Sequence, residues 1–121
     1  MKTVLIIDDE FGVADVLSFA LEDAGYRTVT AVNGRDGLKK AAENKPDLIV
    51  LDFMMPIMDG PATLKAIRGS SELSHVPVIM ISSIDEDGVK ESCKGYSAFL
   101  RKPFHMDTFI NEVSKHLEDP K

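Results

Sequence analysis

Short apolar runs that alternate with helix-like patterns are the feature that most constrains what this chain can fold into. These runs, rich in Val, Ile and Leu, predict strands at residues 3–8, 26–31, 48–51, 77–81 and 98–100. Continuous apolar runs of this length are typical of strands buried in a parallel sheet, and the alternating run at 26–31 suits an edge strand. Because a helical pattern separates each run from the next, the order predicts a series of βαβ units.

Apolar residues at helical spacing predict which faces of the helices turn toward the sheet. In the first and last helices these residues are Val13, Val16, Leu17, Ala20, Leu21 and Ala24, and Met106, Phe109, Ile110, Val113 and Leu117. Gly25 suits the left-handed position that follows a helix. Asn33 is predicted to cap a second helix that directs Leu38, Ala41 and Ala42 inward.

The segment at 85–95 carries the weakest helical pattern. Only Val89 and Cys93 are candidates for burial there, and Gly88 lowers helix propensity by about 1 kcal/mol relative to Ala. The alternation of strands and helices requires a helix in this segment. We therefore expect that helix to be short or mobile.

Five strand–helix units joined by right-handed crossovers predict one α/β domain over residues 1–121. The expected architecture is a doubly wound (βα)5 three-layer sandwich. Its parallel five-stranded sheet is expected to have the flavodoxin-like order 2-1-3-4-5. In that order the first and third strands are neighbours, and the switch point of the connections lies between them.

Composition narrows the class of function. The chain has 121 residues and a net charge of −6, which disfavours nucleic acid as a direct partner but allows a basic patch on one face. Its single cysteine, Cys93, excludes an intramolecular disulfide and suits a reducing compartment. No apolar stretch reaches membrane-spanning length. We expect a cytoplasmic protein that does not bind membranes.

Acidic residues follow two of the predicted strands directly. Asp8 and Asp9 come after the first apolar run, and Asp52 comes after the third. The carboxyl ends of parallel strands form the edge at which open α/β sheets bind ligands. Three carboxylates that meet there must be protonated or neutralised by a cation, and oxygen ligands suit Mg²⁺. The sequence therefore predicts a magnesium site.

Ser82 and Lys102 lie at the ends of the fourth and fifth predicted strands. The expected strand order places this hydroxyl and this ammonium opposite the carboxylates. Lysine and a metal ion can neutralise phosphoryl oxygens, and a hydroxyl can donate a hydrogen bond to them. An aspartate can itself be the nucleophile and form an aspartyl phosphate. The set predicts phosphoryl-transfer chemistry.

Four segments resemble the receiver domains of response regulators in two-component signalling. They are Ile-Asp-Asp-Glu at 7–10, Leu-Asp-Phe-Met-Met-Pro-Ile-Met-Asp-Gly at 51–60, Pro-Val-Ile-Met-Ile-Ser-Ser at 77–83 and Phe-Leu-Arg-Lys-Pro-Phe at 99–104. Each segment alone is a weak signal. Their order and spacing make the resemblance specific, and it extends over nearly the whole chain.

The resemblance implies that Asp52 accepts a phosphoryl group from a phosphohistidine. The donor would be a sensor histidine kinase or a histidine phosphotransfer protein. The resemblance also implies that Asp9, Asp52 and the main-chain carbonyl of Met54 bind Mg²⁺, with Asp8 acting mainly through water. Such a domain catalyses only its own phosphorylation and dephosphorylation and is otherwise not an enzyme.

The same resemblance implies a switch. Ser82 and Lys102 would contact the phosphoryl group, and Phe99 matches the aromatic residue that moves inward when the hydroxyl approaches the phosphate. The Lys102–Pro103 peptide is expected to be cis, as X-Pro bonds permit. A downstream protein would bind the face formed by the fourth helix, the fifth strand and the fifth helix. We hypothesise that residues 85–95 become ordered on phosphorylation.

Other functions remain open from sequence. A magnesium-dependent phosphatase of the haloacid-dehalogenase type also uses a nucleophilic Asp, but it needs an acid where this chain has Met54, and it needs a cap insertion. A flavodoxin-like cofactor binder would need a phosphate loop in place of the acids at 8–10. A receiver that folds but is not phosphorylated is the third alternative. Because the chain stops at Pro120 and Lys121, we expect no output domain. A stand-alone receiver of this kind could act in chemotaxis, in a phosphorelay or as a regulator of a kinase. The alternative is the excised receiver of a longer response regulator.

Overall fold

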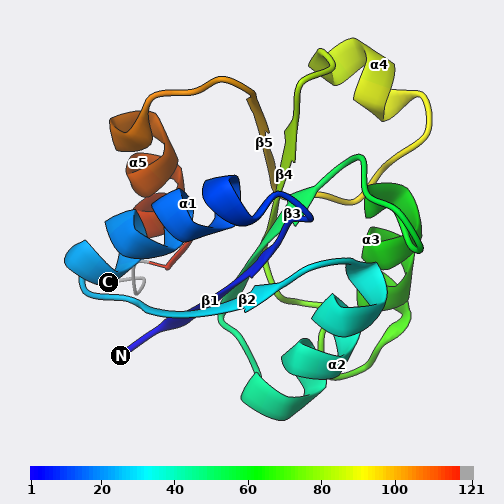
Figure 1. The fold of residues 1–121 in the computed structure, drawn as a ribbon. Coiled ribbons are helices and arrows are strands. Elements are labelled where there is room, and N and C mark those ends of the chain that lie inside the picture. Colours follow the sequence, from blue (N-terminus) through cyan, green and yellow to red (C-terminus); the bar gives the residue numbers. More distant parts are fainter. Residues whose placement is uncertain (118–121) are drawn as a thin grey trace.

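The protein forms the predicted doubly wound sandwich, as a computed structural model that describes residues 1–117 shows (Figure 1). All strand pairs are parallel, and the strand order is β2-β1-β3-β4-β5. The strands are β1 Thr3–Ile7, β2 Arg27–Ala31, β3 Leu48–Asp52, β4 Val78–Ser82 and β5 Ala98–Arg101. The three central strands are buried along their whole length, which explains why their sequences are continuous apolar runs.

The helices cover both faces of the sheet (Figure 1). They are α1 Phe11–Asp23, α2 Gly34–Asn44, α3 Gly60–Gly69, α4 Glu86–Lys90 and α5 Met106–Leu117. One buried cluster joins the sheet to α1 and α5 through side chains such as Leu17 and Phe109. A second cluster joins the other face to α2, α3 and α4 through side chains such as Ala41, Leu64 and Val89.

Local chemistry explains where the helices begin and end. The Asn33 side chain accepts a hydrogen bond from the Asp36 amide at 2.8 Å, which confirms the predicted cap of α2. Asp59 caps α3 in the same way through the Ala62 amide at 3.0 Å. Gly25 follows α1 with φ +98°, a backbone conformation that glycine adopts without strain.

The predicted inward faces need correction at three positions. Val16 is 54% exposed, and Ala24 and Ala42 are also exposed. Val16 and Ala42 lie at the margins of the apolar stripes of their helices, where helical spacing alone does not decide burial, and Ala24 lies just past the last residue of α1. The prediction for the weak segment is confirmed, because α4 has only five residues and buries Val89, with Cys93 buried just beyond it.

Two further findings concern the backbone and the ends of the chain. The Lys102–Pro103 peptide is cis, as the resemblance implied. Within residues 1–117, no helix is both long enough and apolar enough to cross a membrane. The expectation about Pro120 and Lys121 lies outside the described residues.

Candidate phosphoryl-transfer site

The strand register brings the predicted acids together at the carboxyl edge of the sheet. Ile7 pairs with Leu51 across β1 and β3, so Asp8 and Asp52 are the next residues on two neighbouring strands. Asp52 is the last residue of β3, and Asp8 directly follows β1. Both side chains are almost fully buried, with 1% of Asp8 and 5% of Asp52 exposed.

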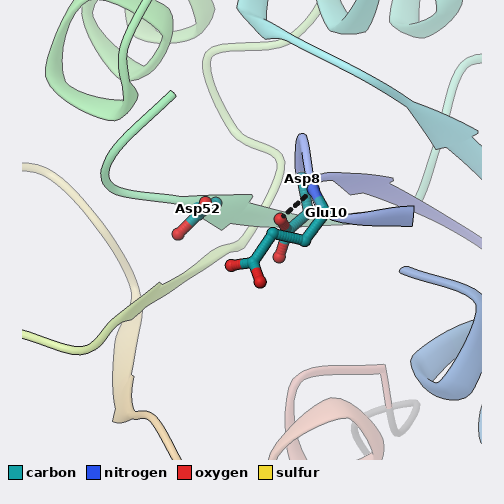
Figure 2. A group of neighbouring side chains, drawn as sticks. All are labelled: Asp8, Glu10 and Asp52. Atoms are coloured by element: carbon teal, nitrogen blue, oxygen red, sulfur yellow. Dashed lines mark hydrogen bonds between the residues drawn. The ribbon is translucent and has the colours of Figure 1, made fainter. Parts of the chain in front are cut away.

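Glu10 completes a group of three carboxylates (Figure 2). One oxygen each from Asp8, Glu10 and Asp52 lies within 4.8 Å of the others. The Glu10 amide donates a hydrogen bond of 2.9 Å to Oδ1 of Asp8, which fixes the turn between β1 and α1. Unlike the two aspartates, Glu10 is exposed, so its carboxylate forms the solvent side of the site.

Lys102 approaches the same three carboxylates from β5. Its Nζ lies 3.3 Å from Oδ2 of Asp8, 3.4 Å from Oδ1 of Asp52 and 3.5 Å from Oε1 of Glu10. Its amide donates to the Ser82 carbonyl at 2.7 Å, which holds this backbone against the end of β4. One ammonium therefore partly neutralises three acids.

The electrostatics of the site show that this neutralisation is incomplete. Burial raises the pKa of Asp52 to about 7, and the charges of Asp8 and Asp9 add to the rise while Lys102 opposes it. Burial likewise raises the pKa of Asp8. Burial acts to lower the pKa of Lys102, but Asp52 and Asp8 hold it above its ordinary value. A further cation at this edge would favour the ionised form of Asp52.

The donor set fits a hard divalent cation. Carboxylate oxygens are the ligands that Mg²⁺ prefers, and the three that meet here come from buried and exposed positions, so that a bound ion would keep access to water. Met54 follows Asp52 by two residues in the β3–α3 loop, and its side chain is 61% exposed. The chemistry of the donors is therefore consistent with the predicted magnesium site.

Glycine is required where the β3–α3 loop returns beside Asp52. A Cβ atom at Gly60 would lie 2.7 Å from the Phe53 Cα and 2.8 Å from the Asp52 carbonyl oxygen. The Gly60 amide donates to the Phe53 carbonyl at 2.9 Å. This close approach holds the backbone of Asp52 and Phe53 in place.

Ser82 lies at the end of β4 and is 2% exposed. Its Oγ accepts a hydrogen bond of 2.9 Å from the Ile84 amide. The register pairs Met80 with Phe99 and Ser82 with Arg101, so Ser82 and Phe99 project to the same face of the sheet, the one that α4 covers. Phe99 is partly buried, and its ring centroid lies 6.2 Å from that of Tyr96.

The structure brings most of the predicted site residues together and adds one. Asp8, Asp52 and Lys102 meet directly, whereas Asp9 is outside the group of three carboxylates and affects Asp52 through its charge. Glu10 was not among the predicted ligands. Its position two residues after Asp8 was the available signal, but the side-chain direction became evident only with the fold.

Comparison with known proteins assigns the family. The model of the response regulator receiver domain matches residues 4–114. The chain therefore belongs to the receiver domains of response regulators, which are phosphorylation-activated signalling modules and not classical enzymes.

Curated relatives include receivers of different lengths. The chain is 39% identical over 105 residues to the alkaline phosphatase synthesis transcriptional regulatory protein PhoP of Bacillus subtilis, covering 85% of this chain and 43% of that protein. It thus spans less than half of PhoP. The polar-differentiation response regulator DivK of Brucella anthropi is 31% identical over 120 residues, with 98% of both chains covered.

Solved structures share the whole fold. The chemotaxis response regulator CheY4 of Vibrio cholerae superposes with a TM-score of 0.91 at 34% identity, covering 97% of this chain and 99% of that one. The response regulator TrrA of Thermotoga maritima, solved in complex with Mg²⁺ and BeF, superposes with a TM-score of 0.87 at 29% identity, covering 97% and 100%.

Proposed function

We propose that Asp52 accepts a phosphoryl group from the phosphohistidine of a sensor histidine kinase or a histidine phosphotransfer protein. The observation that carries this proposal is the contact between Lys102 Nζ and Asp52 at 3.4 Å. Burial raises the pKa of this same Asp52 carboxyl to about 7. Perturbed acids of this kind, positioned by a partly buried cation, are typical of chemically active sites.

In the proposed step, a carboxylate oxygen of Asp52 forms a bond to phosphorus. The bond between phosphorus and the donor imidazole nitrogen breaks, and its electron pair stays on the imidazole. Lys102 is positioned to pair with the transferred phosphoryl oxygens, because its ammonium already lies beside the nucleophile. Ser82 Oγ can then donate to the same group after it leaves the Ile84 amide.

Mg²⁺ would be held by oxygens of Asp8, Asp9 and Asp52, with the Met54 carbonyl, and would supply positive charge against the phosphoryl oxygens. Of these ligands, Asp8 and Asp52 belong to the group whose carboxylate oxygens lie within 4.8 Å of one another, and this geometry supports their part in the assignment. The complex of TrrA with Mg²⁺ and BeF shows that a related receiver holds this ion with a BeF group.

The phosphodonor protein is proposed to dock on the α1 side of the site. Phe11 and Phe19 are 70% and 69% exposed on α1, which is unusual for side chains of this size. A groove of about 350 Å³ is lined by apolar residues that include Val16 of the same helix and Phe104, together with Lys102. An apolar groove that includes a residue of the site suits a partner that must deliver a group to Asp52.

The proposed output uses the opposite side of the site. Movement of Ser82 toward a phosphoryl oxygen would change the face that it shares with Phe99. Phe99 packs on Tyr96, and Tyr96 donates a hydrogen bond to Glu86 of α4 at 2.9 Å. Phosphorylation would thus reach the face formed by α4, β5 and α5, where a downstream protein is proposed to bind.

The test is the intact mass of the protein after incubation with acetyl phosphate, with and without Mg²⁺. We expect a single phosphoryl adduct that requires Mg²⁺ and that is absent from Asp52→Asn. Asp15→Asn, which changes an exposed carboxyl on α1, serves as the matched control and should form the adduct normally. An adduct of equal yield on Asp52→Asn would refute Asp52 as the acceptor.

A further inference from the structure

A basic groove lies between α3 and α4, on a protein whose net charge is −6. Both helices cover the same face of the sheet (Figure 1). The groove between them, of about 580 Å³, is lined by four cationic side chains and one carboxylate, Glu91. The cations are Lys65 and Arg68 on α3, Lys90 at the end of α4, and Lys94 just beyond it. We call this feature the α3–α4 groove.

Arg68 is a fixed cation in this groove. Its Nε donates to the Gly95 carbonyl at 2.9 Å, and its Nη1 donates to the Val76 carbonyl at 2.7 Å and the Ser74 carbonyl at 3.1 Å. Partial burial lowers its pKa. These neutral acceptors hold the guanidinium in place without neutralising its charge, and no carboxylate of residues 1–117 forms an ion pair with it.

The three lysines of the groove are exposed, and within residues 1–117 none of them forms an ion pair. Like charges collected along two helices repel one another unless an anionic partner neutralises them. The groove therefore offers charge complementarity that this chain does not itself satisfy.

We propose that the α3–α4 groove binds an acidic peptide segment of a partner protein. The four cations of the groove are distributed over α3, the end of α4 and the segment just beyond it. That arrangement suits several carboxylates along a chain better than one small anion. Electrostatic contacts of this kind mainly increase the rate and the specificity of association. The proposal depends on charge and shape alone, so it stands apart from the phosphorylation of Asp52.

The test measures binding of a fluorescein-labelled decaglutamate peptide by fluorescence anisotropy at low and at physiological ionic strength. The groove variant is Lys65→Gln with Lys94→Gln, which leaves Arg68 and its hydrogen bonds intact. Lys39→Gln with Lys115→Gln removes the same charge from exposed positions on α2 and α5 and is the matched control. We expect saturable binding that is weakened about tenfold in the groove variant, with the control within about twofold of wild type.

Three results would overturn the proposal. They are absence of saturable binding to wild type at low ionic strength, equal weakening in both double variants, and equally tight binding of a decauridylate with the same dependence on the groove lysines. The last result would assign the groove to nucleic acid. Amide chemical shifts of wild type, titrated with the same peptide, give a second readout that needs no variant. We expect the largest changes near Lys65, Lys90 and Lys94, and changes centred elsewhere would contradict the assignment.

Discussion

The elements on the two sides of the site differ greatly in how deeply they are buried. On one side β1 and β3 are buried along their whole length and carry Asp8 and Asp52 at their ends. On the other side β5 is a partly exposed edge strand, and α4 buries one side chain in five residues. We refer to these as the β1/β3 region (residues 3–8 and 48–52) and the α4/β5 region (residues 85–101).

The difference shows how one small domain can combine fixed chemistry with a movable surface. Acids that must meet around a cation need a rigid backbone, and the fully buried strands provide it. A segment with few buried contacts opens at low free-energy cost and can shift its population when a nearby group changes charge. The comparison predicts that changes in the β1/β3 region lower global stability more than changes in the α4/β5 region do.

The largest expected effect is on stability. Leu51→Ala in β3 should lower the free energy of unfolding by about 2–5 kcal/mol, because it leaves a cavity in the buried sheet. Val89→Ala removes the one buried side chain of α4 and should cost about 1–2 kcal/mol. Urea unfolding measures both. An equal decrease in the free energy of unfolding for the two variants would contradict the difference between the two regions.

The next effect is the pH dependence that Asp52 imposes on the metal-free protein. Burial raises its pKa from 3.8 to about 7, so the folded state favours the protonated acid. The contribution of Asp52 to the free energy of unfolding should therefore be largest near pH 4. It should decrease by at most about 4 kcal/mol as the pH rises from 4 to 7. In EDTA, Asp52→Asn should raise Tm at pH 8 more than at pH 5. Asp15→Asn should not reproduce that difference between the two pH values.

The smallest expected effect compares Tyr96, in the α4/β5 region, with Tyr26, which lies outside both regions. Tyr96→Phe removes a 2.9 Å hydrogen bond to Glu86 and should cost about 0.5–1.5 kcal/mol, together with faster amide exchange in α4. Tyr26→Phe removes a bond of the same length to Ser114, far along the chain from α4. It should have a similar cost and leave exchange in α4 unchanged. Faster exchange in both variants would indicate that α4 does not open separately.

Sequence alone predicted the sheet order, through the flavodoxin-like architecture that the five strand–helix units indicate. It also predicted that Asp8, Asp52 and Lys102 meet, because the apolar runs determine where the strands of a parallel sheet end. The short α4 was also predictable from its scarce apolar residues. The position of the Glu10 carboxylate in the site was not predictable, because it depends on how the turn into α1 directs this exposed side chain.

The α3–α4 groove could not be predicted from the sequence, for a similar reason. Its cations come from residues 65–68 and 90–94, which are separate in the chain and meet only when the two helices pack on one face of the sheet. Composition allowed a basic patch on an acidic protein but could not locate it. The exposure of Val16 and Ala42 likewise depends on how far a neighbouring element covers each helix.

The most direct test of the account is amide hydrogen exchange of residues 85–95, with and without acetyl phosphate and Mg²⁺, in wild type and Asp52→Asn. We expect fast exchange in the unphosphorylated protein and slower exchange after phosphorylation, with no change in Asp52→Asn and little change in β1 and β3. Exchange across 85–95 that is slow from the start and unchanged by phosphorylation would contradict the coupling between the two regions.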